Sequence, residues 1–389
     1  MRDSSRHILF LATEYDAPGM RPYARTIINT MWQEGDHVLI VSRYGADNAA
    51  FPAIPAECIT WIDYPTTVIK KAVFRFHPSQ VTRAIDDIAY QNGISLIYSL
   101  TEELILAHYI NRLQKRIPVL YTVHDASFHD YKSSSPIRWL KDRYIIARPQ
   151  QQMLKRTTFQ VTNSSQQQQF ILDRYPYHRI HYAPFPTLVN DAIAGDGKSV
   201  EELKAVDEGY ILFFGTLHLY KGVHLLYDTY MSHPDLQSRP LVIAGSQPIY
   251  FHRSADEQGV TFINRYVDDS EVKDLFSRAA VVVYPYLSAT QSGVTSIASY
   301  FGKPMVVSDL PFFKETCEGH EGVEFFKSGD SHDLADAINR ALHSTASTRP
   351  LYEQHYSAEA LRTALAEIIS NNYHKLNDTS KICLGDEFA

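Results

Sequence analysis

The chain has 389 residues, of which 44% are hydrophobic and 21% are charged. This length favours about two to three domains, and this composition excludes a disordered protein. No apolar run reaches the roughly 18 to 20 residues that span a bilayer. The three cysteines are far apart, odd in number and without metal-ligand spacing, which argues against a zinc site or a disulfide framework.

The start of the chain and its charge indicate where the protein works. Polar residues 1–6 lead directly into the apolar run 8–12, which predicts a strand and not a signal peptide. We therefore expect a cytoplasmic protein. The net charge of −7 is uneven, because residues 1–185 hold 21 basic and 16 acidic side chains while the rest holds 16 and 28. A basic half suits an anionic partner, although ordinary drift of surface charge explains it equally well; we expect no nucleic-acid partner.

The N-terminal half alternates apolar strands with helices. Strands are predicted at residues 8–12, 37–42, 95–99, 119–123 and 159–163. Between the first two, residues 21–34 carry apolar residues at helical spacing. Strands that are apolar throughout and separated by helices predict a parallel sheet covered on both faces.

The pattern stops near Phe185 and restarts at Tyr210. In the C-terminal half we predict strands at 210–214, 241–244, 260–263, 280–284 and 305–308, and helices from about 223 and at 270–278, 292–300, 332–343 and 358–371. The expected fold class is therefore α/β, with two doubly wound, Rossmann-like parallel-sheet domains. Such sheets bind ligands beyond the carboxyl ends of their strands, so two of them facing each other would form one deep cleft.

The composition along the chain also predicts domain boundaries. We predict an N-terminal domain at residues 1–188, a polar linker at 189–207, a C-terminal domain at 208–355, a C-terminal helix at 356–373 that packs back on the N-terminal domain, and a loose tail at 374–389.

The most informative motif is the stretch 213–222. Neither half opens with Gly-x-Gly-x-x-Gly, and no Gly-x-x-x-x-Gly-Lys-Ser/Thr occurs. The main motifs that would indicate a dinucleotide-dependent dehydrogenase or a P-loop enzyme are therefore missing. Instead a strand ends at Gly215 and Thr216, and Lys221 precedes the next helix. A lysine there can reach a phosphate held at the strand ends. A solvated lysine at a helix start explains the residue alone equally well.

Two further stretches place nucleotide-binding groups near the same edge. Small residues open the helix at 289–296, so the backbone N–H groups of Ser292, Gly293 and Val294 can hold a diphosphate. Capping by Thr290 or Ser292 explains these residues as well. After the strand 241–245, the next strand ends in a segment that brings backbone groups and an aromatic ring to where a nucleobase can stack: Asn264, Arg265, Tyr266 and Val267.

Together these stretches resemble glycosyltransferase family 4 of the GT-B enzymes, most specifically over residues 210–341. The Gly-Lys-Pro turn at 302–304 and, in the N-terminal half, Pro18-Gly19-Met20 and His124-Asp125 add to the resemblance. It implies a hexosyltransferase, of the kind used in polysaccharide biosynthesis. The C-terminal domain would bind a UDP- or GDP-linked sugar, and the N-terminal domain a glycan or lipid-linked acceptor. No further cofactor is implied.

The resemblance also assigns roles to residues. It implies retention of anomeric configuration and a site without a metal, in which Lys221 stabilises the departing diphosphate. His124 would contact the sugar or acceptor, and Asp125 would take the acceptor proton or orient His124. A histidine satisfied at a strand end is the alternative. The expected donor-binding residues are Gly19, Gly215, Thr216, Lys221, Asn264, Arg265, Tyr266, Val267, Gln291, Ser292, Gly293 and Val294. Asp268 and Asp269 are predicted to cap a helix and not to bind a metal.

Two departures from the family pattern keep other functions open. Thr216 stands where the family usually has an arginine, and the two family glutamates fall at Ala289 and Ile297, so both are missing. Gln291 would then substitute as a neutral hydrogen-bonding group. A catalytically silent GT-B subunit that regulates a partner glycosyltransferase is therefore a second hypothesis. An epimerase or a phosphorylase of the same architecture is a third.

Basic and aromatic residues cluster twice in the N-terminal half. Residues 136–156 interleave Trp139, Tyr144 and Ile145 with lysines and arginines, and residues 70–76 hold Lys70, Lys71, Phe74, Arg75 and Phe76. A basic face with an aromatic edge can rest on anionic headgroups. We therefore hypothesise weak peripheral attachment to the inner face of an anionic membrane. Ordinary helices whose charges face water are the alternative.

Overall fold

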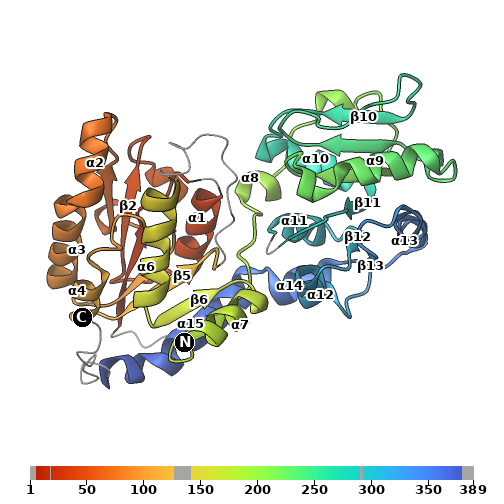
Figure 1. Cartoon of the computed structure of the whole chain (residues 1–389). Coiled ribbons are helices and arrows are strands. Elements are labelled where there is room, and N and C mark those ends of the chain that lie inside the picture. The colour runs from red at the N-terminus through yellow and green to blue at the C-terminus, as the bar shows by residue number, and fades with distance from the viewer. Residues whose placement is uncertain (1–5, 18, 127–141, 290–291, 379–389) are drawn as a thin grey trace. The chain divides into compact units, whose positions relative to one another are not determined.

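The computed structural model describes residues 6–17, 19–126, 142–289 and 292–378. The chain divides into two compact units: unit 1 comprises Met1–Pro184 and Leu361–Ala389, and unit 2 comprises Phe185–Ala360 (Figure 1). Each unit is built on one parallel sheet, of seven strands in unit 1 and six in unit 2. The predicted α/β class with two parallel-sheet domains is confirmed.

The sheet of unit 1 has the strand order β3-β2-β1-β4-β5-β6-β7. Its strands are β1 (His7–Ala12), β2 (His37–Ser42), β3 (Ile59–Asp63), β4 (Ile94–Ser99), β5 (Val119–Val123), β6 (Phe159–Thr162) and β7 (Arg179–Tyr182). In the register, Leu9 of β1 pairs with His37 on one side and with Ile97 of β4 on the other. The chain first builds outward from β1 to β3 and then crosses back to β4, so the strand order reverses between β1 and β4.

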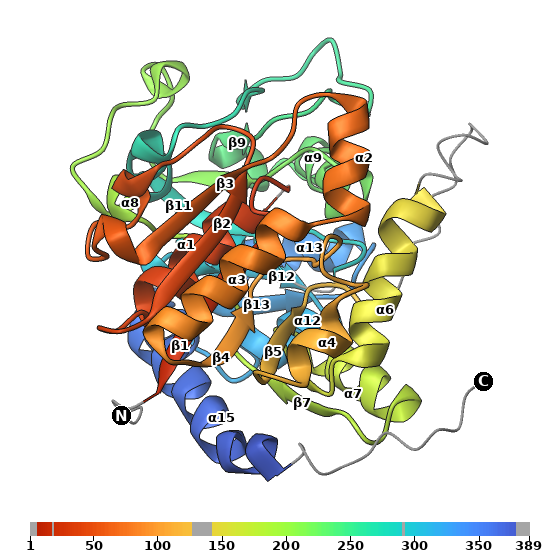
Figure 2. The same cartoon turned by 90° about the vertical axis from the view of Figure 1, so that its left-hand side faces the viewer.

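Helices cover both faces of this sheet. They are α1 (Met20–Met31), α2 (Val68–Phe76), α3 (Ser79–Asn92), α4 (Ile110–Gln114), α6 (Arg148–Arg156), α7 (Ser165–Arg174) and the C-terminal α15 (Ala358–Asp378). Helices α3, α4 and α6 lie on the face toward the viewer in Figure 2, and α1 lies on the other. Helix α1 buries Tyr23, Ala24, Ile27 and Ile28 because these residues recur at helical spacing.

Unit 2 has the strand order β10-β9-β8-β11-β12-β13. Its strands are β8 (Tyr210–Phe214), β9 (Leu241–Ala244), β10 (Val260–Ile263), β11 (Ala279–Tyr284), β12 (Met305–Ser308) and β13 (Val323–Phe326). Its helices are α8 (Asp191–Ala194), α9 (Val223–Ser232), α10 (Val272–Ser277), α11 (Val294–Tyr300), α12 (Pro311–Cys317), α13 (Ser331–His343) and α14 (Arg349–His355). Helix α9 packs against α13, and α11 against α14. Here the strand order reverses between β8 and β11.

The segment predicted as a linker, residues 189–207, belongs to unit 2. Ile193, Val200 and Leu203 are buried in the core of that unit. These apolar residues are separated by polar ones, which is why the sequence alone predicts an exposed linker. Lys273 Nζ also donates to Gly195 O at 2.8 Å, which fixes the segment to α10.

Helix α15 joins the end of the chain to unit 1. From Leu361 onward it belongs to that unit, and Arg362 Nε donates to Thr30 O of α1 at 2.9 Å. The helix continues to Asp378, so the first residues of the predicted loose tail, from 374, are helical. The rest of that tail lies outside the described residues. Within the part of the chain that is described, no helix is both long and apolar enough to cross a membrane.

Candidate functional site

Lys221 lies where the strand order of unit 2 reverses. It ends a short 3₁₀ turn (Leu219–Lys221), and Gly222 follows with a φ of 65°. A Cβ at Gly222 would lie 1.8 Å from Pro285 O, so only glycine fits this close approach to the end of β11. The Lys221 ammonium lies against Gly215 at the end of β8, since a Cβ there would be 3.0 Å from Nζ. It also lies 5.3 Å from the centre of the Tyr286 ring.

The ammonium group of Lys221 is buried. Its side chain is only 8% exposed. Among the residues that the structure describes, no carboxylate pairs with the ammonium group. Burial lowers the pKa of Lys221, and Tyr220 opposes this shift. Because a buried, unpaired cation is costly, an anionic ligand at this point would stabilise it.

Ser292 lies next to the same ring, and Gly293 follows it in the chain. Tyr286 Oη and Ser292 Oγ are 3.4 Å apart. The backbone N–H groups of Ser292 and Gly293 donate no hydrogen bond to a described residue. Gly293 is the N-cap of α11, and no side chain caps the helix. Helix capping therefore does not explain why a serine stands at position 292. Val294 opens the helix, and its carbonyl accepts from Tyr284 Oη at 3.0 Å; Gln291 lies outside the described residues.

The loops after β8 and β9 are held close together. A Cβ at Gly245 would lie 1.8 Å from Gly215 O, so the two backbones approach as only glycine allows. Leu217 N, next to Thr216, donates to Ser246 O at 2.8 Å. With its amide nitrogen facing the loop, Asn264 donates to Gly245 O at 3.3 Å and to Gln247 O at 2.8 Å. The Asn264 side chain therefore supports the loop in which Gln247 has a φ of 94°.

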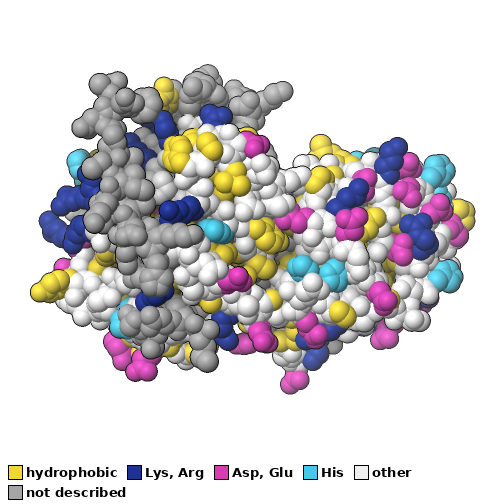
Figure 3. Space-filling model, turned by 90° about the horizontal axis from the view of Figure 1, so that it is seen from below, with side chains coloured by type: hydrophobic (Ala, Val, Ile, Leu, Met, Phe, Trp, Pro, Cys, Tyr) yellow, Lys and Arg dark blue, Asp and Glu magenta, His cyan; other side chains and the backbone are white. Residues whose placement is uncertain are grey.

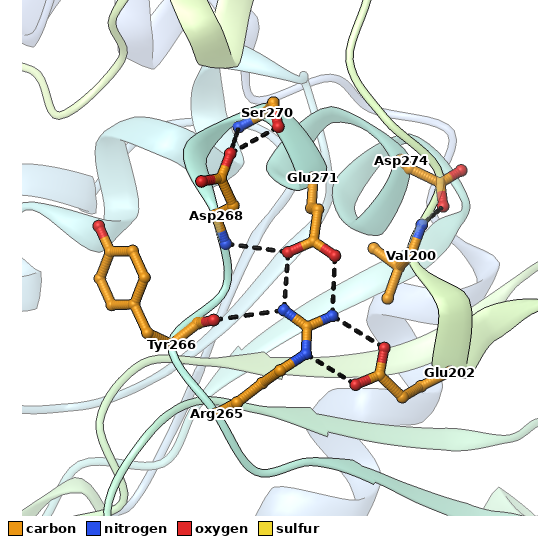
Figure 4. Close-up of polar contacts among 8 residues, drawn as sticks. All are labelled: Val200, Glu202, Arg265, Tyr266, Asp268, Ser270, Glu271 and Asp274. Carbon is orange, nitrogen blue, oxygen red and sulfur yellow. Dashed lines mark hydrogen bonds and ion pairs between the residues drawn. The ribbon is translucent and has the colours of Figure 1, made fainter.

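Arg265 is held by two carboxylates (Figure 4). Its Nε and Nη2 donate to Glu202 at 2.8 Å each. Its Nη1 and Nη2 donate to Glu271 at 2.7 and 2.8 Å, and Nη1 also donates to Tyr266 O at 3.2 Å. These bonds use all five donors of the guanidinium group. The side chain of Arg265 therefore has none left for a ligand, and it fixes the segment at the end of β10 instead.

The neighbours of Arg265 differ in exposure. Val267 is buried, while the Tyr266 ring is 74% exposed and so available for stacking. Asp268 and Glu271 form a capping box at the turn Asp269–Glu271, with Ser270 N donating to Asp268 Oδ1 at 2.9 Å. The prediction that Asp268 caps a helix is confirmed. No cluster of three potential metal-ligating side chains occurs within the described ranges.

The predicted residues of unit 1 follow β1 and β5. Gly19 has a φ of 79° at the N-cap of α1, and open space surrounds the position where a Cβ would lie. His124 is buried, with Nε2 2.8 Å from Leu100 O and its ring 4.6 Å from that of Tyr23. Burial lowers the pKa of His124 to about 4, so the ring is neutral at pH 7. Asp125 beside it is half-buried.

Comparisons with known proteins agree with this architecture. Residues 208–344 match the family described as glycosyl transferases group 1. No curated protein matches the whole sequence significantly. Sucrose-phosphate synthase from Thermosynechococcus elongatus has a similar structure at 18% identity, with a TM-score of 0.62 over 96% of this chain and 100% of that one. Anabaena HepE in complex with UDP-glucose is similar at 17% identity, with a TM-score of 0.62 over 94% and 99%.

The fold is GT-B. A UDP-GlcNAc 2-epimerase from Methanocaldococcus jannaschii shares it at 11% identity, with a TM-score of 0.55 over 94% of this chain and 99% of that one. The GT-B architecture alone therefore does not separate transferases from epimerases. The residues matched by the family include Lys221, Ser292 and the loops after β8, β9 and β10.

The sequence analysis missed two carboxyl groups in the N-terminal GT-B unit. Glu14 follows β1 and Glu103 follows β4, the two strands between which the order reverses. Burial raises the pKa of Glu14 to about 7 and that of Glu103 to about 8. Acidic residues directly after central strands were the available signal. They were overlooked because acidic residues in loops usually face water.

Proposed function

We propose that this chain is a glycosyltransferase that binds a UDP-linked sugar in unit 2 and transfers the sugar to a hydroxyl group of an acceptor bound by unit 1. The buried ammonium of Lys221, unpaired with any described carboxylate, carries this proposal. It lies at the carboxyl ends of β8 and β11, where the reversal of strand order favours a ligand site. The family match over residues 208–344 supports it, as does the similarity to a structure that holds UDP-glucose.

In the proposed reaction the bond between the sugar and the diphosphate breaks, and the acceptor oxygen forms the new glycosidic bond. The nucleoside diphosphate leaves with added negative charge, and the acceptor hydroxyl gives its proton to the carboxylate of Asp125. Lys221 and the N–H groups of Ser292 and Gly293 would stabilise this charge, since preorganised donors do so without reorganising. Retention of configuration and hexosyl specificity are part of the proposal.

Other predicted residues take supporting parts in the proposal. Asn264 and Arg265 position the loops after β9 and β10 through the bonds described above. The exposed Tyr266 ring would stack on the nucleobase. His124, being neutral, would act as a hydrogen-bonding group and not as a cation. Gly19 would let the backbone of unit 1 approach the donor.

Replacing Lys221 tests the proposal most directly. Lys221→Ala removes a charge-assisted hydrogen bond worth about 1.5–3 kcal/mol, so UDP should bind at least about tenfold more weakly by isothermal titration calorimetry. The protein should remain folded, because a buried unpaired charge has been removed. The exposed Lys204, in the same unit, supplies the control variant Lys204→Ala. Equal UDP affinity in Lys221→Ala and wild type would contradict the assignment. UDP binding without turnover of any acceptor would favour the silent subunit.

The proposed transfer also needs no metal ion. If Lys221 and the backbone amides hold the diphosphate, excess EDTA should leave the rate of UDP release nearly unchanged. Loss of activity with EDTA and its rescue by Mn²⁺ or Mg²⁺ would contradict this part of the mechanism.

We also propose that helix α2 brings unit 1 to an anionic membrane. Four of its apolar side chains face solvent: Val68 is 83% exposed, Ile69 79%, Val73 56% and Phe76 55%. Lys70 and Lys71 lie on the same helix. Phe74, which the sequence placed on this surface, is instead buried against Tyr64, and Arg75 donates to Ile145 O at 2.7 Å. Tyr144 is exposed, and Trp139 lies outside the described residues.

A further inference from the structure

Unit 1 has its own point of strand reversal, between β1 and β4. Two loops meet there, because Glu14 lies two residues beyond the end of β1 and Thr101, Glu102 and Glu103 follow β4. Parallel α/β sheets bind ligands in the crevice outside the carboxyl ends of the strands at this point. The donor-binding residues proposed above lie mainly in unit 2, so this position in unit 1 is still without an assigned function.

Glu103 braces the two loops. Its side chain is fully buried, and it accepts hydrogen bonds from Thr13 Oγ1 at 2.5 Å and from Thr101 Oγ1 at 3.4 Å. Thr101 Oγ1 in turn accepts a hydrogen bond from Glu14 N at 3.2 Å. The backbone of Glu14 is therefore fixed relative to the end of β4, and both oxygens of Glu103 are used within the protein.

Glu14 differs from Glu103 in having an unused oxygen. The residue as a whole is half-buried, but its carboxyl group is enclosed, and Oε1 is shielded from solvent without a hydrogen-bond partner. Leaving such a polar atom unpaired is energetically unfavourable. A ligand group that pairs with Oε1 would remove this penalty. The loop itself is already fixed by the hydrogen bond from Glu14 N and does not use Oε1.

The charges around Glu14 restrict the ligand. Arg75 of α2 and Arg43 after β2 act on it electrostatically, and so do Asp16 in its own loop and Glu102 and Glu103 after β4. The two arginines disfavour a cation, and the carboxyl groups disfavour an anion. A neutral hydroxyl group meets both restrictions. It can also pair with Glu14 in either protonation state, because it donates to an ionised carboxylate and accepts from a protonated one.

We propose that Glu14 binds a hydroxyl group of a neutral saccharide and is the residue through which unit 1 recognises the acceptor. This inference rests on the proposed glycosyl transfer and specifies its acceptor class. No covalent step is assigned to Glu14. It holds and orients the hydroxyl, while Glu103 positions the loop from which Glu14 projects.

The test measures saccharide and nucleotide binding separately. Neutral mono- and disaccharides of glucose, galactose, mannose and N-acetylglucosamine are offered to the full chain with UDP present, and saturation-transfer NMR gives their dissociation constants. We expect at least one saccharide to bind, and Glu14→Ala to weaken it tenfold or more while the affinity for UDP is unchanged. Glu34→Gln, on an exposed carboxyl of the same unit, should bind like wild type.

The variant Glu14→Gln distinguishes a loss of saccharide recognition from a loss of folding. The amide keeps the shape and hydrogen-bonding capacity of the side chain, so this variant should fold and bind the saccharide at one pH-independent affinity. In wild type the affinity should change between pH 6 and pH 8, as the carboxyl loses its proton. Unchanged saccharide binding in Glu14→Ala overturns the proposal, and so does the absence of any saccharide binding by a protein that binds UDP. Failure of wild type to bind any nucleotide contradicts the proposed function instead.

Discussion

Burial favours the neutral form of both Lys221 and Glu103, but the two side chains differ in their neighbours. Glu103 is surrounded by hydroxyl donors and other acidic groups, and burial favours its neutral form, with a pKa raised to about 8. Lys221 has no described carboxylate beside it and lies against the electron-rich face of an aromatic ring. Glu103 is therefore satisfied within the folded chain, whereas Lys221 is better satisfied when an anion binds.

The protonation of Glu103 predicts how stability depends on pH. Its pKa is raised from 4.5 to about 8 on folding, so the folded state binds more protons than the unfolded state across this range. Its contribution to stability is present at low pH and is lost as the pH rises from 4.5 to 8. Glu103→Gln removes this loss. The stability of wild type relative to Glu103→Gln should therefore fall by at least about 1.4 kcal/mol between pH 5 and pH 8, the equivalent of one pKa unit.

Urea unfolding at several pH values measures this difference. His124, whose pKa is lowered to about 4, stabilises the fold increasingly from pH 4 to 6.5, but it is present in both proteins and cancels. Glu34→Gln, on an exposed side chain, should follow wild type at every pH. If the difference between wild type and Glu103→Gln is constant with pH, the carboxyl of Glu103 is ionised in the folded protein.

Site residues that lie next to glycines in tight turns can be predicted from the sequence. Lys221 lies against Gly215 and is followed by Gly222, whose close approach to Pro285 O leaves no room for a side chain. The local pattern of residues therefore indicates the geometry. Arg265 is different, because its partner Glu202 is 63 residues away in the sequence. No local pattern indicates that its guanidinium is already occupied. Glu14 likewise depends on contacts between two loops that only the strand order brings together.

At the scale of elements, the strands that the sequence missed all lie at sheet edges. β3 and β7 end the sheet of unit 1, and β13 ends that of unit 2. An edge strand has one neighbour and is partly exposed, so it mixes polar with apolar residues. β7 reads Arg-Ile-His-Tyr and β13 reads Val-Glu-Phe-Phe. The central strands are buried throughout and form apolar runs, which is why most of them were predicted to within one residue.

Helix α2 has too many exposed apolar side chains for an ordinary surface helix. If it docks on a membrane, wild type should sediment with vesicles that contain anionic phosphatidylserine, and much less with neutral phosphatidylcholine vesicles. The double variant Ile69→Glu/Val73→Glu should reduce the bound fraction several-fold. It places two charges where apolar contact is proposed, and it opposes Lys70 and Lys71, each worth about 1 kcal/mol near such a surface.

Tyr177→Glu provides the matched control. Tyr177 is an exposed apolar side chain of the same unit outside α2, so its replacement should leave sedimentation unchanged. Added salt should weaken binding of wild type. If wild type does not bind anionic vesicles even at low salt, the four exposed apolar side chains of α2 have another role.

At the scale of the whole molecule, each unit has its own core and its own sheet. In both, the strand order reverses beside the first strand, after β1 in unit 1 and after β8 in unit 2. The groups at these two positions are opposite in kind: a buried cation in unit 2 and buried carboxyl groups in unit 1. On the face seen in Figure 3, acidic and basic side chains are interspersed over unit 2.

This division predicts where a nucleotide should stabilise the protein. UDP at about 100 times its dissociation constant should stabilise the unit that binds it by about 2.7 kcal/mol. Hydrogen exchange followed by mass spectrometry should then show slower exchange in the loops after β8, β9 and β10 and around Ser292. In unit 1, protection should be confined to the loop that contains Gly19, the one residue there that we predict to contact the donor.

Lys221→Ala should reduce this protection at the same UDP concentration, since a tenfold weaker affinity lowers the stabilisation from about 2.7 to about 1.4 kcal/mol. Lys204→Ala should retain it in full, because the two lysines differ in burial and not in charge. The strands of unit 1 serve as the internal reference, since a separate core need not respond to a ligand bound elsewhere. Protection spread evenly over β1 to β6 would contradict a donor site built mainly on unit 2. Protection of unit 2 that is undiminished in Lys221→Ala would leave the site in place but remove Lys221 as its principal charge.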